Sequence, residues 1–211
     1  MAAEKHGDVA SVRLRDAVAT ERTRLSLQVP PAPYSGEHVA QIHPTGRALV
    51  EFDTDTRPTL LFGAWSTVVF DTRAEHPRSC RWLVEVVVTN AVVQLGVATD
   101  WGAVNTWSDT TGTGDDATSL AVDGVRQTLW CGGAHRGSEG YNVDWAAVAA
   151  SGAPVVVGLS VDLDARRAQH YWAGTWHDLA LPADFFASEP EFVFPAFAAA
   201  GGVIRVIEMG P

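Results

Sequence analysis

The sequence contains no long segment of helical period, and this constrains its fold more than any other feature. Short apolar runs instead recur between clusters of Gly, Pro, Asp and Thr. An amphipathic helix needs apolar residues three or four apart over about ten residues, whereas short bounded runs are typical of strands. The pattern predicts an all-β sandwich or barrel, and the number of runs suits two packed sheets. The candidate strands are residues 47–52, 66–70, 81–89, 92–99, 117–122, 126–130, 155–163, 168–172, 191–197 and 203–209.

The domain organisation follows from length and proline content. A chain of 211 residues with 46% hydrophobic residues is the size of one domain with a sizeable core. Pro30, Pro31 and Pro33 exclude a helix and a central strand near the N-terminus. We therefore predict an extended N-terminal arm over residues 1–45, followed by a single sandwich domain over residues 46–211. Residues 141–150 can form either a short helix or an irregular connection, and residues 181–186 can form another turn of helix.

Charge and hydropathy exclude several partner classes. The chain has 15 Lys and Arg against 25 Asp and Glu, a net charge of −10, so its average surface repels a phosphate backbone. No apolar run reaches the roughly 18 residues that cross a bilayer, and the first residues, MAAEKHGD, lack the apolar stretch of a secretory signal. We expect no nucleic acid, no membrane, and an intracellular, cytoplasmic protein.

The cysteines and histidines do not form a metal-binding pattern. Cys80 and Cys131 are far apart and share no CxxC spacing, so we expect two reduced thiols in or near the core. The seven histidines are scattered, without an HExxH or His-x-His spacing. The sequence therefore predicts neither a metal site nor a cofactor.

The stretch GDDATSLAVDGVRQTLWCGG, residues 114–133, carries adjacent carboxylates at Asp115 and Asp116. Neighbours on an extended chain point to opposite faces, so this pair is poorly placed for joint catalysis. Asp side chains at such loops commonly bond nearby backbone N–H groups, and we expect both to hold a turn. The Asp123-Gly124 pair predicts a hairpin whose two-residue turn has positive φ at both positions.

The order and spacing of several motifs resemble the SPRY domain family over about residues 81–210. The family's usual Asn-Gly turn reads Ala173-Gly174 here, and its usual closing Asn-Phe-Gly reads 208–210, Glu-Met-Gly. Residues 46–80 can supply the flanking strands. The matching motifs are RWLVEVVV (81–88), VVQLGVAT (92–99), GDDATSLAVDGVR (114–126) followed by Trp130, YNVDW (141–145), VVVGLSVDLDARRAQHYWAG (155–174), FPAF (194–197) and VIRVIEMGP (203–211).

The resemblance implies a bent, two-sheet antiparallel β-sandwich that acts as a protein-interaction module, without catalysis or a cofactor. Its partner surface is expected to be built from loops at one end of the sandwich. The partner is then a protein or a multi-subunit assembly. The chain itself is either a regulatory adaptor or a stably bound subunit.

The most informative loop is DWGAVNTWSDTTGTG, residues 100–114, because two tryptophans stand in it among small polar residues. Large aromatics in a polar loop suit a binding hot spot, since each offers wide apolar area and an N–H group. The alternative is that one of them packs back onto the sandwich and pins the loop. The resemblance adds residues of two neighbouring turns. The predicted partner-binding residues are Trp101, Asn105, Trp107, Asp109, Thr89, Asn90, Ala199, Ala200 and Gly201.

The remaining tryptophans have structural interpretations. Trp82, Trp130 and Trp145 lie in predicted strands or at positions matched by the family, so we expect them in the core. Trp172 and Trp176 flank the tight turn WAGTW, where pairing across two strands accounts for both.

The competing function class is a lectin or, less favoured, a glycoside hydrolase. Concanavalin-like sandwiches also carry these activities, and acidic, Trp-rich chains often bind carbohydrate. Asp162 and Asp164 share one face of a strand, as two carboxylates of a retaining hydrolase about 5 Å apart would. No third carboxylate joins them in sequence, and the resemblance places them at a strand end. We therefore expect no enzyme.

Overall fold

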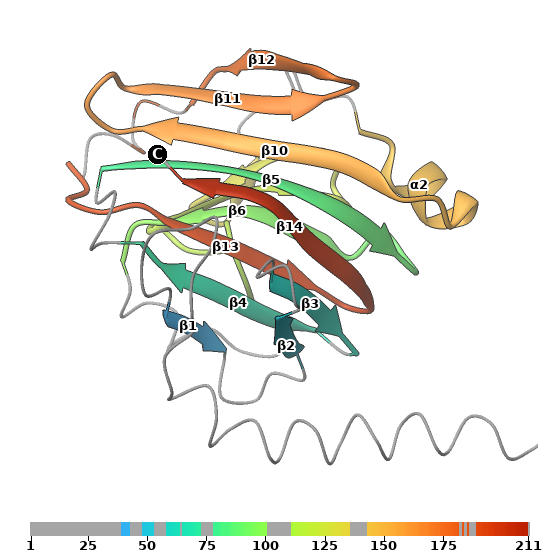
Figure 1. The fold of residues 1–211 in the computed structure, drawn as a ribbon. Helices are drawn as coiled ribbons and strands as arrows, with labels where there is room; N and C mark the ends of the chain where they lie inside the picture. The colour runs from blue at the N-terminus through green and yellow to red at the C-terminus, as the bar shows by residue number, and fades with distance from the viewer. Residues whose placement is uncertain are drawn as a thin grey trace, which may run out of the picture.

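The computed structural model describes residues 39–42, 48–52, 58–63, 65–72, 78–100, 111–135, 143–181, 183, 185 and 189–210. These residues form two antiparallel sheets that pack face to face (Figure 1). The expectation of an all-β, two-sheet antiparallel sandwich is confirmed. None of the helices in these ranges has the length and apolar character needed to cross a membrane.

The first sheet contains both strands of the Asp123 hairpin. Its strands are hydrogen-bonded in the order β1–β4–β13–β6–β7–β8–β9. Their bounds are β1 Val39–Ile42, β4 Ser66–Asp71, β6 Val93–Ala98, β7 Ser119–Asp123, β8 Thr128–Cys131, β9 Ala134–His135 and β13 Phe194–Ala199.

The second sheet is built around the long strand β5. Its order is β12–β11–β10–β5–β14–β3–β2. The bounds are β2 Ala48–Phe52, β3 Pro58–Phe62, β5 Ser79–Val88, β10 Val155–Asp162, β11 Arg167–Trp172, β12 Thr175–Leu179 and β14 Gly202–Gly210. The helix α2, Trp145–Ser151, precedes β10 and lies at one end of the sandwich (Figure 1).

Every candidate strand predicted from the sequence corresponds to an observed strand, but four strands were not predicted. β3 begins at Pro58 and β9 is only two residues long, so neither gives a clear apolar pattern. β12 is mostly exposed and reads TWHDL. β1 lies inside residues 1–45 and pairs with β4, so the first sheet takes in residues before position 46. Residues 1–38 and 43–45 lie outside the described part, and their extended arm stays a prediction.

The core between the sheets centres on Trp82. Side chains of β5 alternate strictly between half-buried and buried, as a strand with one face on a core requires. Trp82 is fully buried and meets the ring of Phe197, on the other sheet, edge to face at 5.0 Å between ring centroids. Its indole Nε1 donates a hydrogen bond to the carbonyl of Gly96 in β6 at 3.2 Å. The indole therefore links the two sheets by both packing and a polar contact.

Other sequence expectations about the core are also confirmed. Trp145 is fully buried at the start of α2, so of the two alternatives for residues 141–150 the structure shows the short helix. The helix begins where the Asp144 carboxylate accepts from the Ala147 N–H at 3.0 Å. Cys80 and Cys131 are free thiols and both are buried. Burial raises the pKa of the Cys80 thiol far above its ordinary value, so this thiol is unreactive.

Four turns lie together at one end of the sandwich, which we call the loop end (right in Figure 1). They join β3 to β4, β5 to β6, β7 to β8 and β13 to β14. Strand register brings them together, because Ala199 pairs with both Ser66 and Val93, and Gly202 pairs with both Phe62 and Val88.

At the sheet edge formed by β12, two histidines stack across neighbouring strands. His170 in β11 is directly opposite His177 in β12, and their ring centroids are 5.3 Å apart. Burial lowers the pKa of His170, and the positive charge of His177 lowers it further.

This pair predicts a loss of stability on acidification. Between the lowered pKa of folded His170 and the ordinary value near 6.5, the unfolded chain binds more protons, so stability falls as pH decreases through this range. His170→Phe keeps a stacked ring without a titrating group. Between pH 7.5 and pH 5.5, the Tm of the native chain should fall by about 2 °C or more beyond the fall of the His170→Phe variant. Circular dichroism melts measure the difference.

His177→Gln serves as the second variant, because it removes the neighbouring charge and leaves His170 in place. We expect an intermediate pH dependence. Equal pH dependence in all three proteins would show that His170 does not contribute.

Candidate functional site

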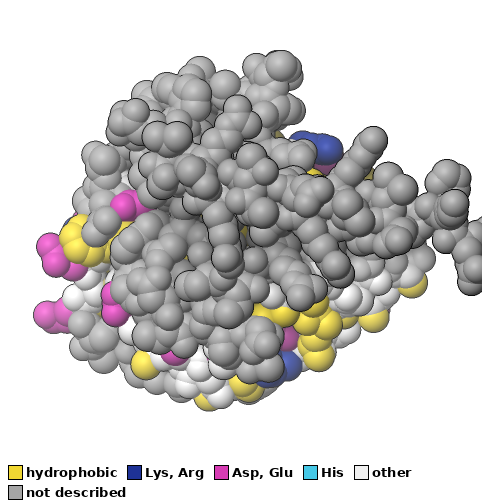
Figure 2. All heavy atoms as spheres, turned by 90° about the horizontal axis from the view of Figure 1, so that it is seen from below, with side chains coloured by type: hydrophobic (Ala, Val, Ile, Leu, Met, Phe, Trp, Pro, Cys, Tyr) yellow, Lys and Arg dark blue, Asp and Glu magenta, His cyan; other side chains and the backbone are white. Residues whose placement is uncertain are grey.

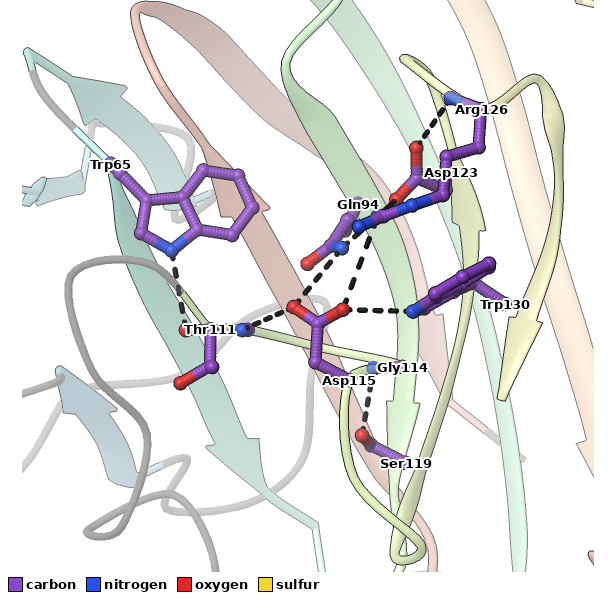
Figure 3. A network of polar contacts seen from close by, with 10 residues as sticks. Trp65, Gln94, Thr111, Gly114, Asp115, Ser119, Asp123, Arg126 and Trp130 are labelled. Carbon is purple, nitrogen blue, oxygen red and sulfur yellow. Dashed lines mark hydrogen bonds and ion pairs between the residues drawn. The ribbon is translucent and has the colours of Figure 1, made fainter. Parts of the chain in front are cut away.

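A group of polar side chains lies on the outer face of the first sheet, next to the loop end. It comprises Gln94, Asp115, Asp123, Arg126 and Trp130, and we call it the polar cluster (Figure 3). Strand alternation places three of its members on this face. The neighbours of Gln94, Asp123 and Trp130 in β6, β7 and β8 belong to the buried core, so these three side chains point the other way.

Asp115 joins a loop to two strands. Its carboxylate accepts hydrogen bonds from the Gly112 N–H at 2.9 Å, from Trp130 Nε1 at 2.8 Å and from Gln94 Nε2 at 3.4 Å. The Asp115 N–H in turn donates to the Gly112 carbonyl at 3.1 Å. The loop that carries Gly112 is thereby fixed against β6 and β8.

Asp123 is the most deeply buried carboxylate of the cluster, with 2% of its side chain exposed. It accepts from Gln94 Nε2 at 3.0 Å and from the Arg126 N–H at 2.8 Å, and it forms an ion pair with the Arg126 guanidinium. That guanidinium also lies 4.0 Å from the ring centroid of Trp130 and 3.9 Å from Asp115. A buried carboxylate is tolerated here because three donors surround it, one of which is the cationic guanidinium of Arg126.

Asp116 has a different set of partners. It accepts from the Thr118 N–H at 2.9 Å, from the Thr118 hydroxyl at 2.9 Å and from the Ser119 hydroxyl at 2.8 Å. These are contacts that hold a turn, as the sequence predicted for both carboxylates. Asp115 holds a turn too, through Gly112, but its bonds to Gln94 and Trp130 were not foreseen.

The hairpin that follows is confirmed, but the predicted two-residue turn is wrong. Asp123 is the last strand residue and pairs with Thr128, so four residues form the turn. Only Gln127 among them has positive φ, at 51°. Asp123 stays in the strand because its carboxylate is bonded to Gln94 and Arg126. Gly124 is required for a different reason, since a Cβ there would lie 2.5 Å from the carbonyl oxygen of Ala91.

Two predictions for tryptophans are corrected. Trp130 is half-buried on the outer face rather than in the core, because it alternates with the core residues on either side of it in β8. Trp172 and Trp176 do not pair with each other. The strand register places Trp176 opposite Tyr171, and these two rings meet edge to face at 5.4 Å.

A hollow of about 390 Å³ opens beside the polar cluster at the loop end. Val125, in the β7–β8 turn, stands on its rim and is 60% exposed, and it is the one large hydrophobic side chain of the described residues that is exposed. In Figure 3, Trp65 lies on one side of Gln94 and Arg126 on the other. The hollow is lined by Trp65, Val92, Val93, Gln94, Asp115, Asp123, Val125 and Arg126.

The predicted partner-binding residues that the structure describes lie at the same end. Asn90 bridges two turns, because its Nδ2 donates to the Ala200 carbonyl at 2.6 Å and its Oδ1 accepts from the Val92 N–H at 2.8 Å. Gly201 has φ of 90°, and a Cβ there would lie 2.6 Å from the hydroxyl of Thr89. Ala199 is fully buried in the core. The other predicted residues, Trp101, Asn105, Trp107 and Asp109, lie outside the described residues and remain predictions.

Sequence reasoning missed most of the residues that line the hollow. One signal was available for Gln94, which is the polar residue within the apolar run VVQLGVAT. No comparable signal marks Trp65, Val125 or Arg126, because their proximity depends on pairing between strands that are distant in sequence.

Asp162 and Asp164, the two carboxylates spaced for a hydrolase pair, each have a partner within the sandwich. Asp162 accepts from the Ala165 N–H at 2.8 Å, and Asp164 forms an ion pair with Arg78 at 2.6 Å. Both lie at the β10–β11 turn, as the sequence resemblance predicted.

Comparison with known proteins rests on the structure. No family model and no curated protein matches the sequence. The SPRY domain of human HERC1 is similar, with a TM-score of 0.52 at 13% identity, over 79% of this chain and 92% of that one. The chain has a SPRY-like fold. The PSpry domain of TRIM65 gives a TM-score of 0.45 at 13% identity, covering 75% of this chain and 84% of that one. The carbohydrate recognition domain of Emp46p gives 0.42 at 9% identity, over 87% and 94%.

The polar cluster predicts that Asp115 contributes to stability. Asp115→Ala leaves the Trp130 indole N–H and the Gly112 N–H without their acceptor, and we expect a loss of about 2–3 kcal/mol in the free energy of unfolding. Asp164→Ala is the matched control, because it removes an exposed ion pair and should cost less than about 1 kcal/mol. Urea unfolding measures both. Equal costs would mean that the bonds of Asp115 carry no extra stability.

Proposed function

We propose that the chain is a non-catalytic protein-interaction module that binds its partner at the loop end, over the hollow beside Val125. The observation that carries this proposal is the position of Val125. A valine with 60% of its surface exposed, on the rim of a hollow, is a side chain that a partner can bury.

The rigidity of the surroundings supports the proposal. The turns at the loop end are held by strand pairing and by side chains that bond from one turn to another, as Asn90 does with Ala200. The polar cluster fixes the β7–β8 turn and the loop at Gly112 on the same sheet. A binding surface held in one conformation loses little conformational entropy when a partner docks.

The SPRY-like fold and the charge of the chain support the same conclusion. The sequence resemblance implies a module that uses loops at one end. A net charge of −10 disfavours nucleic acid and favours partners with a basic surface. On the face in Figure 2, acidic side chains also lie at the left edge, which is the end of the sandwich opposite the loop end, so the negative charge is not confined to the loop end.

We further propose that the partner is a cytoplasmic protein or assembly, in which the chain serves as an adaptor or a stable subunit. Trp101, Asn105, Trp107 and Asp109 are proposed to complete the surface, as the composition of their loop predicts. Salt resistance and fixed stoichiometry in affinity purification would identify a stable subunit, whereas exchange would identify an adaptor.

Introducing a charge on the rim of the hollow tests whether the partner binds there. Val125→Asp should weaken binding to the partner identified by affinity purification and mass spectrometry at least tenfold, because it replaces the exposed apolar contact with a carboxylate. Ala165→Asp, in the exposed β10–β11 turn, adds the same charge elsewhere and should change binding less than twofold. Surface plasmon resonance measures the affinities, and circular dichroism should show unchanged folding.

Undiminished binding of Val125→Asp would place the partner surface elsewhere. A glycan array on the native chain separates the lectin class from a protein binder. Specific glycan binding that Val125→Asp abolishes would replace the proposed function with the lectin alternative.

A further inference from the structure

The orientation of the Gln94 amide is fixed by its neighbours. Its Nε2 donates to Asp123 at 3.0 Å and to Asp115 at 3.4 Å. Carboxylates accept hydrogen bonds and cannot donate them, so the reversed amide, with oxygen toward two carboxylates, is excluded. The amide oxygen Oε1 therefore points away from both, toward the side of Trp65 (Figure 3).

This oxygen lacks a donor. Gln94 is 4% exposed, and its Oε1 is buried with no hydrogen-bond partner in the part of the chain that the structure describes. A buried acceptor without a donor costs about 1–3 kcal/mol. The residue also lines the hollow at the loop end. An N–H group that reached Oε1 from the hollow would recover this cost.

Most donors around the hollow are already used inside the protein. Trp65 Nε1 donates to the Thr111 carbonyl at 3.2 Å, and Gln94 Nε2 donates to the two carboxylates. Arg126 directs one guanidinium nitrogen at Asp123. Arg126 keeps further guanidinium N–H groups, but among the described residues that line the hollow the buried polar atom without a partner is an acceptor, Gln94 Oε1.

The charges that line the hollow also favour a ligand group that donates hydrogen bonds. Two carboxylates, Asp115 and Asp123, face one guanidinium, Arg126, which leaves one net negative charge. A cation entering beside Gln94 would be attracted by this charge, and the indole of Trp65 offers it an aromatic face. Val92 and Val125 line the same space, whereas the side chain of Val93 is buried in the core. Such walls suit an aliphatic stem that ends in a charged group.

We infer that the hollow receives a basic side chain, Lys or Arg, of the partner protein. Its N–H groups donate to Gln94 Oε1 and its charge balances the excess of carboxylate, while its methylene groups contact Val92 and Val125. This inference rests on the proposed function, because it names the chemistry of the partner at the same surface. Complementarity with a chain of net charge −10 agrees with a basic partner.

The test uses three short peptides, each with the sequence acetyl-Ala-Ala-X-Ala-Ala-amide, where X is arginine, citrulline or glutamate. Citrulline is a neutral group of almost the same shape as arginine, so it separates charge from shape. Titrations into the ¹⁵N-labelled full chain follow the side-chain amide signal of Gln94 and the indole signal of Trp65. We expect saturable shifts with the arginine peptide and an affinity at least tenfold higher than for citrulline, with no binding of glutamate.

Three variants locate the binding. Val125→Lys places a competing cation on the rim and should weaken the arginine peptide at least fivefold. Ala165→Lys adds the same charge in the exposed β10–β11 turn and should change affinity less than twofold. Gln94→Met removes the acceptor while keeping the length of the side chain, and should weaken the peptide at least tenfold. Because Val125 is exposed, its variant tests the inference even where Gln94→Met fails to fold.

The inference is overturned by equal binding of the citrulline or glutamate peptide, by the absence of saturable shifts, or by equal effects of the two lysine variants. These results are distinguishable from failure of the proposed function. If Val125→Asp loses partner binding but the native chain does not bind the arginine peptide, the proposed partner surface stands and the inferred recognition of a basic side chain is rejected. The opposite result is also informative. If binding of the arginine peptide depends on Val125 but binding of the partner does not, the hollow is a cation site and is not the partner surface.

Discussion

The hydrogen bond from the Trp82 indole to the Gly96 carbonyl is the contact on which the rest of the structure depends. It joins β5 of one sheet to β6 of the other, inside a core where a carbonyl without a donor would be costly. Gly96 is required for an approach within its own sheet, because a Cβ there would lie 1.8 Å from the carbonyl oxygen of Leu120 in β7. The two sheets are thus linked by one large side chain of β5 and one backbone carbonyl of β6.

The same strand, β6, carries the outer surface. Gln94 is two residues before Gly96 and on the same face of the strand, so the register that places Gly96 against β7 also places Gln94 opposite Asp123. The polar cluster follows from this pairing, since Gln94 reaches one carboxylate on β7 and another, Asp115, on the loop before it. The core and the candidate site therefore share one register, and a slip of one residue would destroy both.

Most of the fold could be predicted, because a strand that buries one face against the core shows a local pattern of apolar residues in the sequence. β5, with its alternation from Cys80 to Val88, is the clearest case. β12 could not be predicted, because an exposed edge strand has little apolar pattern. The candidate site could be predicted from the sequence only in part. Adjacent carboxylates and an Asp-Gly pair predict a turn, but the bonds from Asp115 to Trp130 and from Asp123 to Gln94 depend on pairing that local sequence does not encode.

The two adjacent carboxylates, Asp115 and Asp116, act through structure, and this has a consequence for recognition. A fully satisfied buried network selects one arrangement of its members, because every alternative leaves a buried charge or donor unpaired. In this cluster the carboxylates are satisfied, and the unsatisfied atom is Gln94 Oε1. Asp115 and Asp123 hold the amide of Gln94 by its nitrogen and thereby present its oxygen. In the proposed recognition, Asp115, which looks catalytic in the sequence, therefore helps to determine which chemical group a partner must bring.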